Sequence, residues 1–157
     1  MTKYMDRPDR THYYMNIAKA VSERSTCIRR RYGAVIVKDD RIVSTGYNGS
    51  VSGEVNCSDT NICPRIEQNI PHGTRYETCV AIHAEQNAIL SAHKEDLKGA
   101  TMYIYGYDVV EEEEIPGVPC IMCIRFIKSA GIKTSNVIFK APEDVLNILR
   151  EEAKEYV

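Results

Sequence analysis

Hydrophobic and polar residues change their spacing along this chain, and the changes predict alternating helices and strands. Between Thr11 and Arg24, apolar side chains recur at helical intervals, which predicts a first helix. Two apolar runs at 34–37 and 42–45 flank the polar turn 38–41 and predict a β-hairpin. The sequence from Gly46 to Gly49 then predicts a turn-forming loop.

The second half of the chain continues the alternation after an irregular stretch. Residues 50–80 show little periodicity, so we expect a long loop or loosely ordered insert, which in a compact domain is usually functional or tethered. Helices are expected at 81–94, 120–130 and 142–155, and strands at 101–105 and 137–139. The acidic run from Glu111 to Glu114, before Pro116 and Gly117, predicts a solvated loop.

This order of elements is typical of a layered α/β domain. With 157 residues, the chain is expected to form a single domain, 1–157, that carries the insert at about 50–80. The strand–helix–strand unit around 120–130 should be a parallel, right-handed crossover.

Composition and charge narrow the class of partner. A hydrophobic content of 43% and a charged content of 27% are ordinary for a globular protein. The net charge of −2 does not indicate the basic surface that nucleic-acid-binding proteins usually have, and it favours a small substrate. No apolar run approaches the length of a membrane span, and the first residues lack the apolar core of a secretory signal, so we expect a cytoplasmic protein without a membrane partner.

Two short motifs carry the candidate chemistry: His83-Ala84-Glu85 and Pro119-Cys120-Ile121-Met122-Cys123. One imidazole and two thiolates supply three ligands to one zinc, which leaves the fourth tetrahedral position open to water, as in catalytic sites. Zinc lowers the pKa of that water, and Glu85 can move protons to and from it. Both motifs stand at expected helix starts, where backbone N–H groups favour thiolate and hydroxide. The pattern matches the H-x-E…P-C-x-x-C signature of zinc nucleobase deaminases.

An alternative interpretation of these motifs is a zinc that only staples the fold, with Glu85 an ordinary helix residue. Further motifs argue for the catalytic interpretation and carry a resemblance to a known family. They are Ser25-Thr26-Cys27 with the arginines that follow, Gly33 to Val37, Gly46-Tyr47-Asn48-Gly49, Gln86 to Ile89, and Ala130-Gly131-Ile132. Over about residues 10–140 the chain resembles the deoxycytidylate (dCMP) deaminases of the cytidine-deaminase superfamily. The small bacterial and phage enzymes, including those called ComE operon protein 2, are especially similar.

The resemblance implies a three-layer α/β/α sandwich with a mixed sheet of about five strands. It implies hydrolysis of dCMP to dUMP and ammonia, in which zinc-bound hydroxide attacks C4 of cytosine and Glu85 shuttles protons. It also implies a homo-oligomer, often a hexamer, and dCTP and dTTP as effectors of some members. The approach to the cysteines, 106–118, departs from the family pattern and leaves the nucleotide preference open.

The same resemblance implies roles for residues outside the two motifs. Asn48 would contact the sugar or the base, and Ala84 would line the pyrimidine pocket through its backbone. The phosphate candidates are Arg24, Arg29 and Arg30, each of which could instead be a solvated surface arginine.

Four cysteines remain after the catalytic pair is set aside: Cys27, Cys57, Cys63 and Cys79. The resemblance implies a second, structural zinc held by Cys27, Cys57 and Cys79, with Cys63 or His72 as the fourth ligand. Such a site would offset the entropy lost when a long insert becomes ordered. The alternative is that all four are reduced thiols in the core and the loop.

Two other functions stay open at this point. The first keeps the zinc chemistry but acts on free cytidine or deoxycytidine, cytosine, guanine, or an adenosine in tRNA. The basic stretch from Arg24 to Arg31 favours a phosphorylated small substrate over these. The second is a catalytically silent, zinc-stapled binding module, and the intact Glu85 argues against it.

Overall fold

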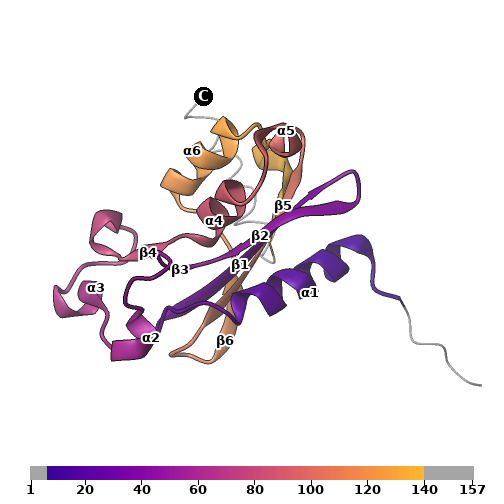
Figure 1. Cartoon of the computed structure of the whole chain (residues 1–157). Coiled ribbons are helices and arrows are strands. Elements are labelled where there is room, and N and C mark those ends of the chain that lie inside the picture. The colour runs from indigo at the N-terminus through magenta and orange to yellow at the C-terminus, as the bar shows by residue number, and fades with distance from the viewer. Residues whose placement is uncertain (1–6, 140–157) are drawn as a thin grey trace, which may run out of the picture.

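The computed structural model describes residues 7–139 of the 157, and its centre is one mixed β-sheet (Figure 1). The strands are β1 (Arg30–Lys38), β2 (Arg41–Tyr47), β5 (Thr101–Asp108), β6 (Glu113–Pro116) and β7 (Val137–Phe139). β1 pairs antiparallel with β2 as the expected hairpin and antiparallel with β5 on its other side. The far edge of β5 is shared by β6, which is antiparallel, and β7, which is parallel. The predicted parallel direction of the strands around the crossover helix is therefore confirmed.

Helices cover both faces of the sheet, as the sandwich prediction requires (Figure 1). The helix α1 (Arg10–Ser22) packs on one face. The other face is covered by α4 (Ala84–Leu90), α5 (Lys94–Leu97) and α6 (Ile121–Ser129), and the turn η2 (Thr134–Asn136) leads into β7. None of the helices within residues 7–139 has both the length and the apolar character needed to cross a bilayer.

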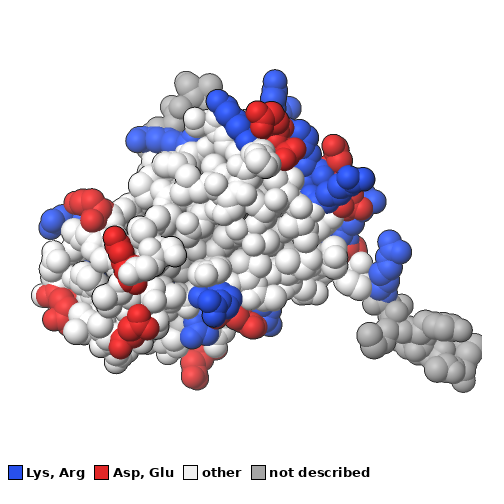
Figure 2. Space-filling model, viewed as in Figure 1, with Lys and Arg blue, Asp and Glu red and all other residues white. Residues whose placement is uncertain are grey.

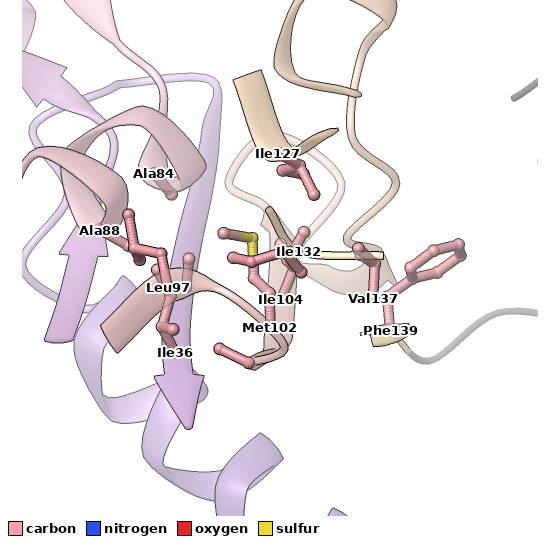
Figure 3. Packing of buried hydrophobic residues seen from close by; sticks show 12 residues of the cluster. Ile36, Ala84, Ala88, Leu97, Met102, Ile104, Ile127, Ile132, Val137 and Phe139 are labelled. Atoms are coloured by element: carbon pink, nitrogen blue, oxygen red, sulfur yellow. The ribbon is translucent and has the colours of Figure 1, made fainter. Parts of the chain in front are cut away.

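The two-residue period of a strand explains why residues 34–37 of β1 and 102–105 of β5 are apolar without interruption. Ile36, Met102 and Ile104 point to the α4–α6 side, where they contact Ala84, Ala88 and Ile127 (Figure 3). Their neighbours Val35, Val37 and Tyr103 point to the α1 side. Because both faces are buried, both sets of alternating positions must be apolar.

Two glycines let the helices approach the sheet closely. A Cβ atom on Gly33 would overlap the carbonyl oxygen of Ala18 in α1, and one on Gly46 would overlap the backbone of α4 at Ala84 and Ala88. The position of α4, which carries the His83 motif, therefore depends on the absence of a side chain at residue 46.

The insert is built of short elements rather than a structureless loop. It is closed at its base by β3 (Gly49–Ser50), which pairs antiparallel with β4 (Ala81–Ile82). Between them lie α2 (Cys57–Thr60), α3 (Pro64–Glu67) and the 3₁₀ turn η1 (Tyr76–Thr78). The prediction of a loose insert thus needs correction, since backbone hydrogen bonds define each of these turns.

Two other predicted elements also differ from the structure. The helix expected at 81–94 is divided into β4, α4 and α5, because His83 and His93 both have extended backbones and each precedes a new helix. The acidic run was expected to be a solvated loop, but Glu113–Pro116 forms β6. Cross-strand pairing with 105–108 of β5 outweighs the unfavourable strand propensity of the glutamates. The helix expected at 142–155 lies outside the described residues.

Candidate active site

His83 is held at the junction of β4 and α4. It occupies the residue before α4, its N–H donates to Oε1 of Gln86 at 3.1 Å, and its carbonyl accepts the N–H of Asn87 at 3.0 Å. The Asn87 side chain donates in turn to the carbonyl oxygen of Tyr47 at 2.8 Å. The start of α4 is therefore fixed to the end of β2, and His83 with it.

The two motif cysteines stand at the start of α6, beside the His83 ring. Cys120 precedes the helix and its Sγ accepts the N–H of Cys123 at 3.4 Å. Nδ1 of His83 lies 3.6 Å from Sγ of Cys120 and 3.3 Å from Sγ of Cys123. All three ligand atoms fall within 4.8 Å of one another.

These separations suit zinc. With zinc–sulfur bonds of about 2.3 Å and a zinc–nitrogen bond of about 2.0–2.1 Å, tetrahedral geometry places sulfur and nitrogen ligands about 3.5 Å apart. Imidazole and thiolate donors are also those that zinc prefers. Three residues of this chain would hold the ion, and the fourth position would remain for a small molecule.

Hydrogen bonds among His83, Cys120 and Cys123 shift the pKa values of these three side chains. A hydrogen bond from Cys123, opposed by burial and aided by His83, lowers the pKa of Cys120 to about 4. The same hydrogen bond, together with burial, raises the pKa of Cys123. The hydrogen bond with Cys120 raises the pKa of His83. Binding of a divalent cation to this group would compete with protons for the imidazole and the thiolates.

Glu85 lies beside this group and is almost fully buried, with 5% of its surface exposed. Burial raises its pKa, against the effect of a hydrogen bond with the Cys123 side chain. It is not a member of the ligand cluster. A carboxyl group with a raised pKa next to a metal centre can both accept and donate a proton near neutral pH.

A cavity of about 540 Å³ opens beside these residues, a size typical of small-molecule sites. His83, Ala84, Glu85 and Cys120 line it, as do Arg29, Arg30 and Asn48. The structure thus gathers most of the residues that the sequence nominated. Arg24 is exposed and does not line the cavity.

Asn48 has an evident structural role at the cavity wall. Its Oδ1 accepts the Oγ–H of Ser25 at 2.6 Å and the N–H of Tyr32 at 2.8 Å, and its Nδ2 donates to the carbonyl oxygen of Arg30 at 2.9 Å. One N–H of the amide remains for a ligand. Asn48 therefore fixes the backbone of the arginine segment whether or not it also touches a substrate.

The arginines have different surroundings. Arg30 lies with Nη1 3.2 Å from the His72 ring and Nε 3.8 Å from the Asp108 carboxylate. Burial and the nearby charge of Arg30 lower the pKa of His72. His72 therefore contacts Arg30 in this structure rather than the cysteines for which it was considered as a partner.

The four remaining cysteines come near one another at the insert. The N–H of Ser58 donates to the carbonyl oxygen of Thr26 at 3.1 Å, which holds the neighbouring Cys57 next to Cys27. Burial raises the pKa of Cys57, and the thiols of Cys63, Cys27 and Cys79 raise it further. Within residues 7–139, however, only His83, Cys120 and Cys123 bring three such ligand atoms within 4.8 Å.

Other residues of the cavity wall escaped the sequence reasoning. They are Tyr32, Arg65, Tyr76, Ile115, Pro116 and Val118. The sequence pattern could have identified Tyr32, because Tyr32 lies on the same face of its strand as Ala34 and Ile36. Arg65 and Tyr76 lie in the aperiodic insert, where no sequence pattern indicates which side chains point inward.

Residues 8–139 match the model of the family described as "Cytidine and deoxycytidylate deaminase zinc-binding region". The deoxycytidylate deaminase of Mycobacterium phage D29 is 42% identical over 134 residues, which cover 82% of this chain and 94% of the phage protein. The ComE operon protein 2 of Bacillus subtilis is 39% identical over 132 residues, which cover 83% of this chain and 59% of that protein.

Solved structures of dCMP deaminases are also similar to this chain. The dCMP deaminase of cyanophage S-TIM5 in its apo form has a TM-score of 0.60 and 25% identity, with 93% of this chain and 94% of that one covered. The same cyanophage protein in complex with dCMP and dUMP has a TM-score of 0.56 and 26% identity, with 82% and 79% covered.

Proposed function

Because the chain belongs to the family of cytidine and deoxycytidylate deaminases, we propose that it hydrolyses dCMP to dUMP and ammonia. Relatives that carry the name of dCMP deaminase support this choice of substrate. One observation carries the proposal: the His83, Cys120 and Cys123 cluster and the buried Glu85 border a cavity that Arg29 and Arg30 also line.

His83 through Nδ1, and Cys120 and Cys123 through Sγ, would hold the zinc ion. When bound, the ion supplies the Lewis acidity that makes water a nucleophile near neutral pH. The three residues come from the starts of two helices that pack on the same face of the sheet, so the sandwich sets their separation.

Glu85 moves the protons of the reaction. Its carboxylate takes a proton from the attacking water and delivers it to N3 of the cytosine ring, while the oxygen adds to C4. It then carries the second proton to the amino group, which leaves as ammonia. The balance is one water consumed and one ammonia released, and burial of Glu85 keeps bulk water from competing for these protons.

The remaining cavity residues would orient the nucleotide. Arg29 and Arg30 provide positive charge for the 5′-phosphate. The free N–H of Asn48 would donate to the sugar or the base, and the backbone of Ala84 would border the pyrimidine. A nucleoside, which lacks the phosphate, would lose the contacts to the arginines.

The decisive assay compares dCMP, CMP, dCTP and deoxycytidine on protein of known zinc content. We expect ammonia release that is fastest with dCMP and weak with deoxycytidine. Comparable kcat/KM for dCMP and deoxycytidine would contradict a phosphate site. Absence of ammonia release from all four compounds would overturn the deaminase proposal.

We further propose that Cys27, Cys57 and Cys79, with Cys63 as fourth ligand, hold a second, structural zinc. The effect of these thiols on one another's pKa supports it, and the contact of His72 with Arg30 favours Cys63 over His72. The zinc content should be two per chain, and one per chain in a Cys57→Ser variant. One zinc per chain in both proteins would contradict the proposal.

We also infer a homo-oligomer, a hexamer, and regulation by dCTP and dTTP. The resemblance to the family supports both, and Figure 2 shows a broad area free of charged residues on one face, with charges gathered at its margins. Light scattering and assays with each triphosphate would test these inferences. None of the six cysteines forms a disulfide, which is typical of proteins in reducing compartments, so we propose that the protein is cytoplasmic.

A further inference from the structure

Tyr76, in the insert, reaches the metal-binding cluster of the sandwich. Its ring stands edge-on to the His83 imidazole, with centroids 5.5 Å apart and an interplanar angle of 73°. Aromatic pairs favour this arrangement at centroid separations of about 4.5–7 Å. Burial raises the pKa of Tyr76, and the nearby Cys120 thiol raises it further. Tyr76 therefore lies against His83, one of the three residues that would hold the ion.

The described hydrogen bonds of the His83 ring leave its far nitrogen without a partner residue. A metal-binding histidine usually donates its second ring N–H to a carboxylate, a carbonyl or water, and this bond fixes the ring. Nδ1 of His83 faces the two thiols. Its Nε2 forms no hydrogen bond with another residue in the part of the chain from 7 to 139. The edge contact with Tyr76 therefore restrains the ring plane in addition to the contacts of the ring with the two thiols and with the backbone of Gln86.

Tyr76 is itself anchored by a buried arginine of the insert. Arg65 is only 7% exposed, and its guanidinium carbon lies 5.8 Å from the centre of the Tyr76 ring. Its Nη1 donates to the carbonyl oxygen of Arg75 at 2.7 Å and to Oγ1 of Thr78 at 3.2 Å, and its Nη2 donates to the carbonyl oxygen of Pro71 at 2.9 Å. One side chain therefore holds both ends of the segment that carries Tyr76.

This anchoring acts at a strained point of the backbone. Arg75, directly before Tyr76, has a φ of 47°, in the left-handed region that residues with a side chain rarely adopt. The bond from Arg65 to the Arg75 carbonyl stabilises that conformation, which turns Tyr76 toward His83.

We propose that Tyr76 is a positioning residue for the His83 imidazole and that Arg65 holds it there, so that the insert helps to set the metal-binding geometry. The proposal rests on the proposed function in one respect, the assignment of His83 as a zinc ligand. It predicts that removing the ring of Tyr76 loosens zinc at a site to which Tyr76 contributes no ligand.

The test measures zinc release to a chromogenic chelator from the full-length protein. A Cys123→Ser variant identifies the release phase of the His83 site, because that phase is missing from it. In Tyr76→Ala and Tyr76→Leu proteins we expect this phase to be faster by about 10- to 100-fold, as for other residues that orient a ligand. Tyr76→Phe should release zinc like the parent, because the hydroxyl group makes no hydrogen bond with another described residue.

Two comparisons separate positioning from general destabilisation. Tyr13→Ala removes a half-exposed ring from α1, on the opposite face of the sheet, and should change neither zinc release nor deamination. Tyr76→Leu fills the space of the ring without its edge, so slow release from Tyr76→Leu would overturn the proposal even if Tyr76→Ala is poorly folded. Equal release from Tyr76→Phe and Tyr76→Ala would overturn it as well.

Activity measurements distinguish this proposal from the function on which it rests. If the parent deaminates dCMP, Tyr76→Leu should lower kcat more than it raises KM, because the ligand and not the nucleotide is displaced. If the parent deaminates none of the cytosine compounds, the proposed function fails. The zinc-release comparison still decides whether Tyr76 positions His83.

Discussion

The sandwich and the insert at 51–80 maintain their structures in different ways. The sandwich buries Ile36, Met102, Ile104 and Ile127 almost completely between sheet and helices. The insert leaves most of its large apolar side chains exposed: Val51, Val55, Ile62, Ile66 and Val80. Besides Ile70, it buries a charged side chain, Arg65, and a thiol, Cys63. Hydrophobic burial therefore dominates in the scaffold, whereas the segment that borders the cavity depends more on hydrogen bonds, those of the buried Arg65 among them.

The different ways in which the sandwich and the insert are stabilised have a consequence for function. Two helix starts on a well-packed sheet give the His83 cluster fixed separations, which a metal centre requires. The insert, which is held by hydrogen bonds of polar side chains, can vary in sequence and shape without disturbing that scaffold. The sandwich thus carries the metal-binding cluster and the proposed nucleotide contacts, and the insert completes the cavity wall with Arg65 and Tyr76.

The largest effect should come from a change that leaves both regions folded. Glu85→Gln keeps the size of the side chain but removes its ability to carry protons, so kcat for dCMP should fall by about 10²- to 10⁴-fold. Zinc content and the far-UV circular dichroism spectrum should match those of the parent. A kcat within a few-fold of the parent would contradict the role of Glu85.

Truncation of an apolar side chain should lower the free energy of unfolding much more in the sandwich than in the insert. Met102 is fully buried, so Met102→Ala should lower the free energy of unfolding by about 2–5 kcal/mol. Ile62 is 52% exposed in the insert, and Ile62→Ala should change it by no more than about 0.5 kcal/mol. Urea denaturation measures both, and similar losses for the two variants would break the comparison.

The insert should instead be sensitive to loss of its buried arginine. Arg65→Met removes the guanidinium hydrogen bonds to the carbonyl groups of Pro71 and Arg75, which keep only their local bonds from Thr74 and Thr78, and this loss should destabilise the insert by about 1–3 kcal/mol. Limited proteolysis should then cut within 51–80 while the strands of the sheet stay protected. Arg41→Met, at an exposed position of β2, serves as the control and should leave the cleavage pattern of the parent.

The smallest effect on stability should come from a change at the start of α1. Asp9 precedes α1, and its Oδ1 accepts the N–H of His12 at 2.8 Å, which lowers the pKa of Asp9. Because the folded-state pKa is depressed, this stabilisation is present above the unfolded value of about 3.9 and is lost as pH falls through the folded value. Asp9→Ala should therefore lower Tm by a few degrees at pH 7 and leave it nearly unchanged at pH 2. An equal difference at both pH values would contradict the cap.

The sequence was most informative where the local pattern determines the structure. The continuous apolar runs predicted β1 and β5, and the H-x-E and C-x-x-C spacings predicted which side chains meet at the start of α4 and α6. It was partly wrong at the acidic run, where Glu111 and Glu112 lie in an exposed turn as expected but Glu113 and Glu114 pair with β5. It also gave no indication of Arg65 or Tyr76, because their inward orientation depends on contacts between segments that are distant in sequence.

Gly46 shows how far catalytic sensitivity extends beyond reactive groups. Since α4 rests directly on the backbone at this residue, even a methyl group there would lift the helix and widen the gap between His83 and the two thiols. Displacements of about 1 Å can cost two orders of magnitude in rate. A random library selected for turnover should accordingly tolerate almost nothing at position 46, although an inspection limited to chemically functional side chains would overlook it.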